Sequence, residues 1–174
     1  MTRPTFQLAC TVSWDAESPR KDCGGGLLDD RRVQTLVAVA LYEAGVEDTD
    51  AIEVGVTFAG LERIAALNVE HREVDGPTDV LSFPIDGLDE ELPPGMPREL
   101  GDVVISPEYV QRQLDTGTTM AADGTLEGAL ERCVVHGVLH LCGFDHERSE
   151  NHAQEMFGLE QLVLDRVRSA GAGA

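Results

Sequence analysis

Residues 135–146, Val-His-Gly-Val-Leu-His-Leu-Cys-Gly-Phe-Asp-His, hold three of the five histidines in this 174-residue chain. His136 and His140 are four residues apart, so on a helix their side chains share one face, one turn from each other. The apolar residues around them recur at helical spacing, which predicts that the segment belongs to a helix. Gly143 is expected to end this helix, because glycine readily adopts the left-handed conformation found there. The bend then brings His146 toward the first two histidines.

Three neutral imidazoles around one point suit zinc, with a fourth position left open for water. The spacing resembles the H-E-x-x-H-x-x-G-x-x-H pattern of metzincins, although Gly137 stands where that pattern has its glutamate base. Cys142 lies off the face that His136 and His140 share, so a ligand role for it is disfavoured. The segment therefore predicts a zinc site on His136, His140 and His146; the alternative is that these are ordinary helix and loop histidines.

The composition is that of a globular protein, with 42% hydrophobic residues in a length that suits one domain. We expect this domain over residues 1–169 and a disordered tail over residues 170–174. No apolar run approaches the ~20 residues that span a membrane, and no secretory signal is visible. The four cysteines show no C-x-x-C spacing, so free thiols in a cytoplasmic protein are expected.

The net charge of −19, from 32 acidic and 13 basic residues, limits the possible partners. An acidic surface repels both nucleic acid and anionic membranes. A substrate that carries phosphate would need a local basic spot on this chain, or a partner that supplies the missing attraction. Most of the acidic residues are expected to form a solvated surface.

Hydrophobic periodicity predicts both strands and helices along the chain. Strands are expected at residues 5–13, 51–58, 80–83 and 101–106. Helices are expected from Asp29 or Asp30 to Ala44, and at residues 60–70, 108–115, 126–142 and 149–168. Asp79 and Asp102 are expected to cap turns at strand ends.

Two further blocks accompany the histidine segment. Residues 68–84 read Asn-Val-Glu-His-Arg-Glu-Val-Asp-Gly-Pro-Thr-Asp-Val-Leu-Ser-Phe-Pro, and residues 101–106 read Gly-Asp-Val-Val-Ile-Ser. Together with His-Gly-Val-Leu-His-Leu-Cys-Gly-Phe-Asp-His at 136–146, they resemble, in the same order, three motifs of the YbeY family of bacterial endoribonucleases that mature ribosomal RNA. The resemblance spans residues 68–146.

The resemblance implies a small α+β domain, with a mixed sheet of about four strands and helices packed on it. It implies one metal ion, usually taken as zinc, on His136, His140 and His146, and an arginine, here Arg72, that acts in the RNA-cleaving site. It further implies action on ribosomal RNA precursors, notably at the 3′ end of small-subunit RNA, and in ribosome quality control. His71 sits where the family usually has an aromatic residue, and could itself contact metal or RNA.

The chemistry of these residue types fits such an activity. A zinc ion on three histidines lowers the pKa of bound water and polarises a phosphoryl oxygen. The fork of Arg72 can bind a phosphate through two donors, although without the resemblance an ion pair with Glu73 or Asp75 is the expected role. Asp145, beside His146, could orient a metal ligand or take up a proton.

Two other functions remain open. One is a metal hydrolase of another substrate, such as a peptide, which the metzincin-like spacing suggests and Gly137 disfavours. The other is a non-catalytic factor associated with the ribosome, in which the metal is structural; three ligands without an obvious fourth disfavour it. For the nuclease, we expect the precursor RNA to be presented by a ribosomal particle or a protein partner. The sequence does not predict an oligomeric state.

Overall fold

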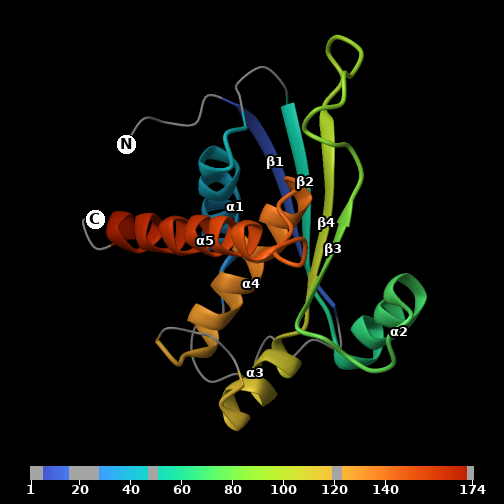
Figure 1. The fold of residues 1–174 in the computed structure, drawn as a ribbon, viewed down its shortest axis with the longest axis vertical. Helices are drawn as coiled ribbons and strands as arrows, with labels where there is room; N and C mark the ends of the chain where they lie inside the picture. Colours follow the sequence, from blue (N-terminus) through green and yellow to red (C-terminus); the bar gives the residue numbers. More distant parts are fainter. Residues whose placement is uncertain (1–5, 16–27, 47–50, 119–122, 172–174) are drawn as a thin grey trace.

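A four-stranded mixed sheet forms the centre of the fold (Figure 1). The computed structural model describes residues 6–15, 28–46, 51–118 and 123–171. The strands β1 (Gln7–Trp14), β2 (Ala51–Phe58), β3 (Val80–Pro84) and β4 (Arg98–Ile105) lie in the order β1-β2-β4-β3. The first, second and fourth strands run parallel, and β3 is antiparallel to β4. The predicted α+β class, with a mixed sheet of four strands, is confirmed.

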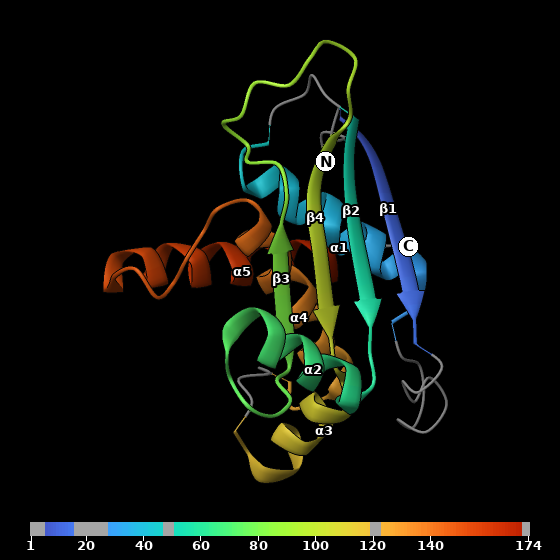
Figure 2. The same ribbon diagram turned by 90° about the vertical axis from the view of Figure 1, so that its right-hand side faces the viewer.

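The helices cover the two faces of the sheet unequally. Figure 2 shows α1 (Asp30–Glu43), α4 (Leu126–Leu141) and α5 (Glu150–Gly171) behind the sheet, and α2 (Leu61–Arg72) in front of one end. The short helix α3 (Pro107–Thr116) follows β4. Side chains alternate along a strand, and β2 shows the consequence: Ile52, Val54, Val56 and Phe58 are buried, whereas Glu53 on the opposite face is exposed.

Local capping explains where α1 begins. The Asp29 carboxylate accepts a hydrogen bond from the Arg32 amide at 2.6 Å, so one otherwise unpaired donor of the first turn is satisfied. This settles the predicted start of the helix in favour of Asp29 as the cap. The inward face of α1 then packs on the other helices and the sheet through five fully buried residues: Val33, Leu36, Val37, Ala40 and Leu41.

The helix α4 packs unusually close to the sheet at Gly137. A Cβ atom at this position would lie 2.4 Å from Cγ1 of Val103 on β4, so a side chain has no room there. The hydroxyl group of Ser82 on β3 donates a hydrogen bond to the Gly137 carbonyl oxygen at 3.1 Å. The position that holds a glutamate in metzincins therefore serves packing in this chain.

The strand β4 and the helix α5 extend furthest beyond their predicted bounds. β4 begins at Arg98, whose buried guanidinium donates to the carbonyl oxygens of Gly87 and Glu90 and so ties the preceding loop to the strand. α5 ends at Gly171 rather than at residue 168, so the first two residues of the predicted tail are helical. Residues 172–174 lie outside the described part of the chain.

The structure bears on the expected lack of a membrane span and on the state of the cysteines. In the described ranges, none of the helices combines the length and apolar character that a membrane crossing requires. Cys10, Cys133 and Cys142 are free thiols, as predicted. Cys23 lies outside the described residues.

Candidate metal centre

The helix α4 presents His136 and His140 side by side. Their ring centroids are 4.7 Å apart, and the two Nε2 atoms approach to 3.1 Å. Both side chains are partly exposed, while Val135, Val138 and Leu139 on the flanking positions are fully buried. The packed residues fix the helix, so the two imidazoles share one face with little freedom to separate.

A left-handed turn at the end of α4 brings the third histidine into place. Gly143 has a φ of 91°, a conformation that side-chain-bearing residues rarely adopt. Its amide donates to the His140 carbonyl oxygen at 3.0 Å, and the Phe144 amide donates to that of Leu139 at 3.1 Å. This pair of bonds is the Schellman arrangement that ends helices. The chain then returns, and the His146 ring centroid lies 5.1 Å from that of His136 and 5.2 Å from that of His140.

The three imidazoles fit a metal ion. Each offers one ligand nitrogen, and these atoms lie within 4.8 Å of one another. Two nitrogen ligands of a tetrahedral zinc ion lie about 3.3 Å apart, since each Zn–N bond is roughly 2.0–2.1 Å long. The observed Nε2 separation of 3.1 Å is close to this value. A purely imidazole set suits zinc, copper, iron or nickel.

The surroundings of His140 favour the neutral imidazole that a metal needs. Burial lowers the pKa of His140, and the neighbouring His136 and His146 lower it further. A backbone hydrogen bond at Phe144 and the charge of Asp145 act in the opposite direction without reversing the shift. The lone pair of His140 is therefore available at neutral pH.

Cys142 is not part of this group. Among the residues that the structure describes, the group that could hold a metal consists of the three histidines. Burial raises the pKa of the Cys142 thiol to about 12, which disfavours the thiolate that a metal would bind. The sequence argument against Cys142 as a ligand agrees with this geometry.

Arg72, the last residue of α2, lies beside the loop that carries His146. Its Nη2 atom is 3.7 Å from Oε1 of Glu147, the residue that follows the third histidine. The predicted alternative was an ion pair with Glu73 or Asp75, but the partner within the described residues is Glu147. Both side chains of the pair are more than half exposed. The structure thus places an accessible guanidinium beside the residue that follows the third histidine.

Asp145 shapes the loop between the second and third histidines. Its Oδ1 atom accepts a hydrogen bond from the Glu147 amide at 2.9 Å, and its Oδ2 atom is 3.8 Å from Nε of Arg148. These contacts tighten the turn that returns His146 to the cluster. His71, a possible further contact to metal or RNA, packs edge-on against Phe83 with centroids 4.9 Å apart, outside the three-histidine group.

Two residues that the sequence reasoning missed lie behind His136. The Glu160 carboxylate of α5 is fully buried, and its Oε2 atom is 3.1 Å from Nδ1 of His136. Its Oε1 atom faces Nε of Arg132, one helical turn before His136 on α4. A signal existed in the sequence, because Glu160 is an acidic residue on the apolar stripe that includes Met156 and Val163.

Comparison with known proteins identifies the family. The family model described as Endoribonuclease YbeY matches residues 27–168. The chain belongs to the YbeY family. The match covers the blocks at residues 68–84, 101–106 and 136–146, and it extends into both α1 and α5.

Relatives in the YbeY family support this over most of the chain. An Endoribonuclease YbeY of Acinetobacter baumannii is 33% identical over 166 residues, which cover 95% of this chain and 97% of the relative. One from Persephonella marina is 41% identical over 120 residues, with 69% and 73% covered. The solution structure of a Thermotoga maritima protein has a similar fold, with a TM-score of 0.57 at 22% identity, covering 94% and 92% of the two chains.

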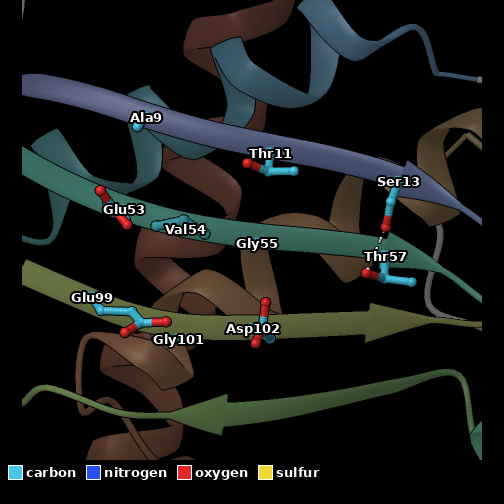
Figure 3. Close-up of a pocket in the computed structure, with 10 residues that line it drawn as sticks. All are labelled: Ala9, Thr11, Ser13, Glu53, Val54, Gly55, Thr57, Glu99, Gly101 and Asp102. Carbon is cyan, nitrogen blue, oxygen red and sulfur yellow. Dashed lines mark hydrogen bonds between the residues drawn. The ribbon is translucent and has the colours of Figure 1, made fainter.

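A hollow of about 430 Å³ lies on the open face of the sheet of this YbeY-family chain (Figure 3). Three carboxylates border it: those of Glu53, Glu99 and Asp102. The prediction that Asp102 caps a turn is wrong, because it lies inside β4 and its side chain crosses toward Gly55 on β2, where a Cβ atom would be 1.9 Å from Oδ1. Carboxylates repel phosphate, so this hollow does not suit RNA. Asp79 does cap a strand start, since its Oδ1 accepts from the Val80 amide at 2.9 Å.

Proposed function

We propose that this YbeY-family protein is a zinc-dependent endoribonuclease that acts on ribosomal RNA precursors, notably at the 3′ end of small-subunit RNA, and in ribosome quality control. Family membership supports the endoribonuclease activity and the RNA class. The observation that carries the proposal is the convergence of His136, His140 and His146 beside the exposed Arg72. An arginine at the edge of a three-histidine centre is an arrangement suited to phosphodiester cleavage.

The three histidines would hold one zinc ion. When bound, this ion supplies a Lewis acid and a water molecule that ionises near neutral pH. The histidines contribute neutral nitrogen donors, and the pKa of His140 is lowered toward that state. Gly137 leaves no glutamate base next to His136, and packing against Val103 excludes one at that position. This counts against a peptide hydrolase of the metzincin kind.

Arg72 is assigned to the phosphate that is cleaved. Its contact with Glu147 is long and solvent-exposed, and such pairs contribute only ~0–1 kcal/mol. A phosphate can therefore replace Glu147 with little loss, and it gains a two-donor interaction with the guanidinium fork. The charge of Arg72 persists at any working pH, so it can stabilise the negative charge that develops during cleavage.

Asp145 is assigned to the loop and to proton handling. Its hydrogen bond to the Glu147 amide holds the turn, and its charge acts on His140. Its side chain is 40% exposed, so water can reach the carboxylate and a proton can leave from it. We propose that Asp145 orients the third ligand and accepts a proton during cleavage.

The net charge of −19 shapes how the protein meets RNA. Long-range attraction to a polyanion is absent, so the affinity for free RNA is expected to be weak. We propose that a ribosomal particle or a protein partner in the cytoplasm presents the precursor. The cut is then directed by the assembly in which the RNA sits.

The experiment compares Arg72→Ala with Arg63→Ala. Arg63 lies on the same helix, is similarly exposed, and makes a similarly long ion pair with Asp15 at 3.6 Å. Single-turnover cleavage of a labelled precursor RNA should fall by ~10²–10³ in the Arg72 variant, because one donor to the transition state is lost. The Arg63 variant should cleave at the rate of the unaltered protein, and Arg72→Lys should restore little because an ammonium group lacks the fork.

The two alternative functions predict different results for the same protein and its variants. A peptide hydrolase would cleave casein and show no dependence on Arg72. A factor with a structural metal would bind zinc but cleave neither substrate. Equal cleavage by the Arg72→Ala and Arg63→Ala variants would remove Arg72 from the mechanism.

A further inference from the structure

The α5 helix contacts the metal histidines from behind through Glu160. We propose that Glu160, supported by Arg132, is a positioning residue that sets the tautomer and ring orientation of His136 for metal binding. The inference deepens the proposed function and rests on its metal site. It starts from the distance of 3.1 Å between Oε2 of Glu160 and Nδ1 of His136.

The direction of this hydrogen bond follows from its chemistry. An ionised carboxylate can only accept, so the proton lies on Nδ1 of His136. The lone pair of the same ring is then on Nε2, the atom that lies 3.1 Å from Nε2 of His140. Without such a partner, an imidazole can place its proton on either nitrogen and can turn its ring over. Glu160 thus selects the form whose free nitrogen points into the cluster.

Arg132 offsets the free-energy cost of burying the Glu160 carboxylate. Glu160 has no exposed surface, and a buried charge is costly unless an opposite charge and hydrogen bonds compensate it. Nε of Arg132 faces Oε1 of Glu160, so the carboxylate is shared between Arg132 and His136. These two residues and His140 follow each other at intervals of four along α4, on one face. One face of α4 thus carries the charge partner of Glu160 followed by two of the proposed metal ligands.

A second contact from α5 reaches the cluster. Phe157 lies three residues before Glu160, on the same face of the helix, and its ring stacks on that of His146 with centroids 5.4 Å apart. Two of the three metal histidines therefore rest on neighbouring residues of α5. The helix α5 thus holds the two rings in place, with Glu160 making the polar contact to His136 and Phe157 the apolar contact to His146.

The test measures zinc affinity and the His136 tautomer rather than RNA cleavage. Zinc dissociation constants are obtained by competition with a chromophoric chelator for the full chain and for Glu160→Gln and Glu160→Ala. Loss of a partner that orients a metal-bound histidine typically weakens metal binding by about 10–100-fold. We expect Glu160→Ala near the upper limit and Glu160→Gln near the lower, because the amide oxygen still accepts from Nδ1. Nitrogen NMR of the zinc-free protein should show His136 protonated on Nδ1, and this preference should disappear in the Glu160→Ala variant.

Glu131→Gln is the matched control. Glu131 is an equally buried carboxylate of α4, but it pairs with Arg32 at 2.6 Å and with Arg168 at 3.8 Å, away from the histidines. The Glu131→Gln substitution should lower the melting temperature. Its zinc affinity should stay within about twofold of that of the unaltered protein, as expected for independent sites. The inference is overturned if Glu160→Ala binds zinc like the unaltered protein and keeps the Nδ1 tautomer, or if both carboxylate variants lose zinc equally. Absence of zinc binding by the unaltered protein would instead refute the proposed function, while the tautomer still reports on Glu160.

Discussion

Replacing Gly137 by alanine probes the close packing that places the metal helix on the sheet. The added Cβ atom would lie 2.4 Å from Cγ1 and 3.0 Å from Cγ2 of Val103, and 3.2 Å from the Ser82 hydroxyl group. Val103 is β-branched and fully buried on β4, so its side chain has little freedom to move away from the added atom. The strain must therefore be relieved by lifting α4 from the sheet.

The cost can be estimated from three effects. Overpacking a well-packed core costs ~1–3 kcal/mol. Weakening the hydrogen bond of 3.1 Å from Ser82 to the Gly137 carbonyl costs ~1 kcal/mol, while replacing a helical glycine by alanine gains roughly the same amount. Because these two effects nearly cancel, we expect Gly137→Ala to destabilise the fold by ~1–3 kcal/mol. For a chain of this length, that lowers the melting temperature by roughly 2–12 °C.

Urea unfolding and calorimetry on metal-free protein measure this effect, with Gly158→Ala as the control. Gly158 is also helical, in α5, but a Cβ atom there meets nothing within 4 Å. That variant should be more stable than the unaltered protein by ~0.5–1 kcal/mol, since only the helix preference changes. A Gly137→Ala protein that is as stable as the Gly158→Ala protein would refute the packing argument.

Four further predictions concern charge and thiol chemistry. The pKa of His140 in the folded protein is lowered below its ordinary value. The metal-free fold therefore keeps its full stability at a pH above that ordinary pKa, and loses stability as the pH falls through the lowered pKa. Urea midpoints at about pH 7 and pH 5 test this, and the midpoint at pH 5 should be the lower. Zinc affinity should fall below about pH 6.5, where protons compete for the imidazoles, and chelator competition over a pH series measures it. Burial raises the pKa of Cys133 and of Cys142, so a thiol reagent at about pH 8 should modify both far more slowly in the folded than in the urea-unfolded protein. Random single-stranded RNA should bind weakly to the isolated protein, and tight, salt-sensitive binding in a filter assay would contradict the charge argument.

The parts of the site that depend on neighbouring residues could be predicted from the sequence. His136 and His140 are brought together by helical spacing alone, and Gly143 determines the return of the chain to His146. The elements carry equally local signals, such as the alternation along β2 and the carboxylate of Asp29 at the start of α1. These features need no knowledge of the tertiary structure.

The parts of the site that depend on packing between distant segments could not be predicted from the sequence. Arg72 contacts Glu147 because α2 and the metal loop approach each other in space. The family resemblance implied a role for Arg72 in the site, but nothing in the sequence indicated this partner. Glu160 contacts His136 because α5 crosses α4, although an acidic residue on an apolar stripe was a visible signal. Asp102 was assigned to a turn because its polarity suggested one, yet a strand with one open face accommodates such a residue in its middle.

The most direct test of the central claim is cleavage of a precursor carrying the 3′ end of small-subunit ribosomal RNA, measured together with the zinc content. The protein is stripped with a chelator, assayed, and reloaded with zinc, and the variant with His136, His140 and His146 all replaced by alanine is treated in parallel. We predict that cleavage disappears on stripping and returns as about one zinc ion per chain is restored, and that the triple variant neither binds zinc nor cleaves. Undiminished cleavage by the zinc-free protein, or full zinc occupancy in the triple variant, would contradict the account.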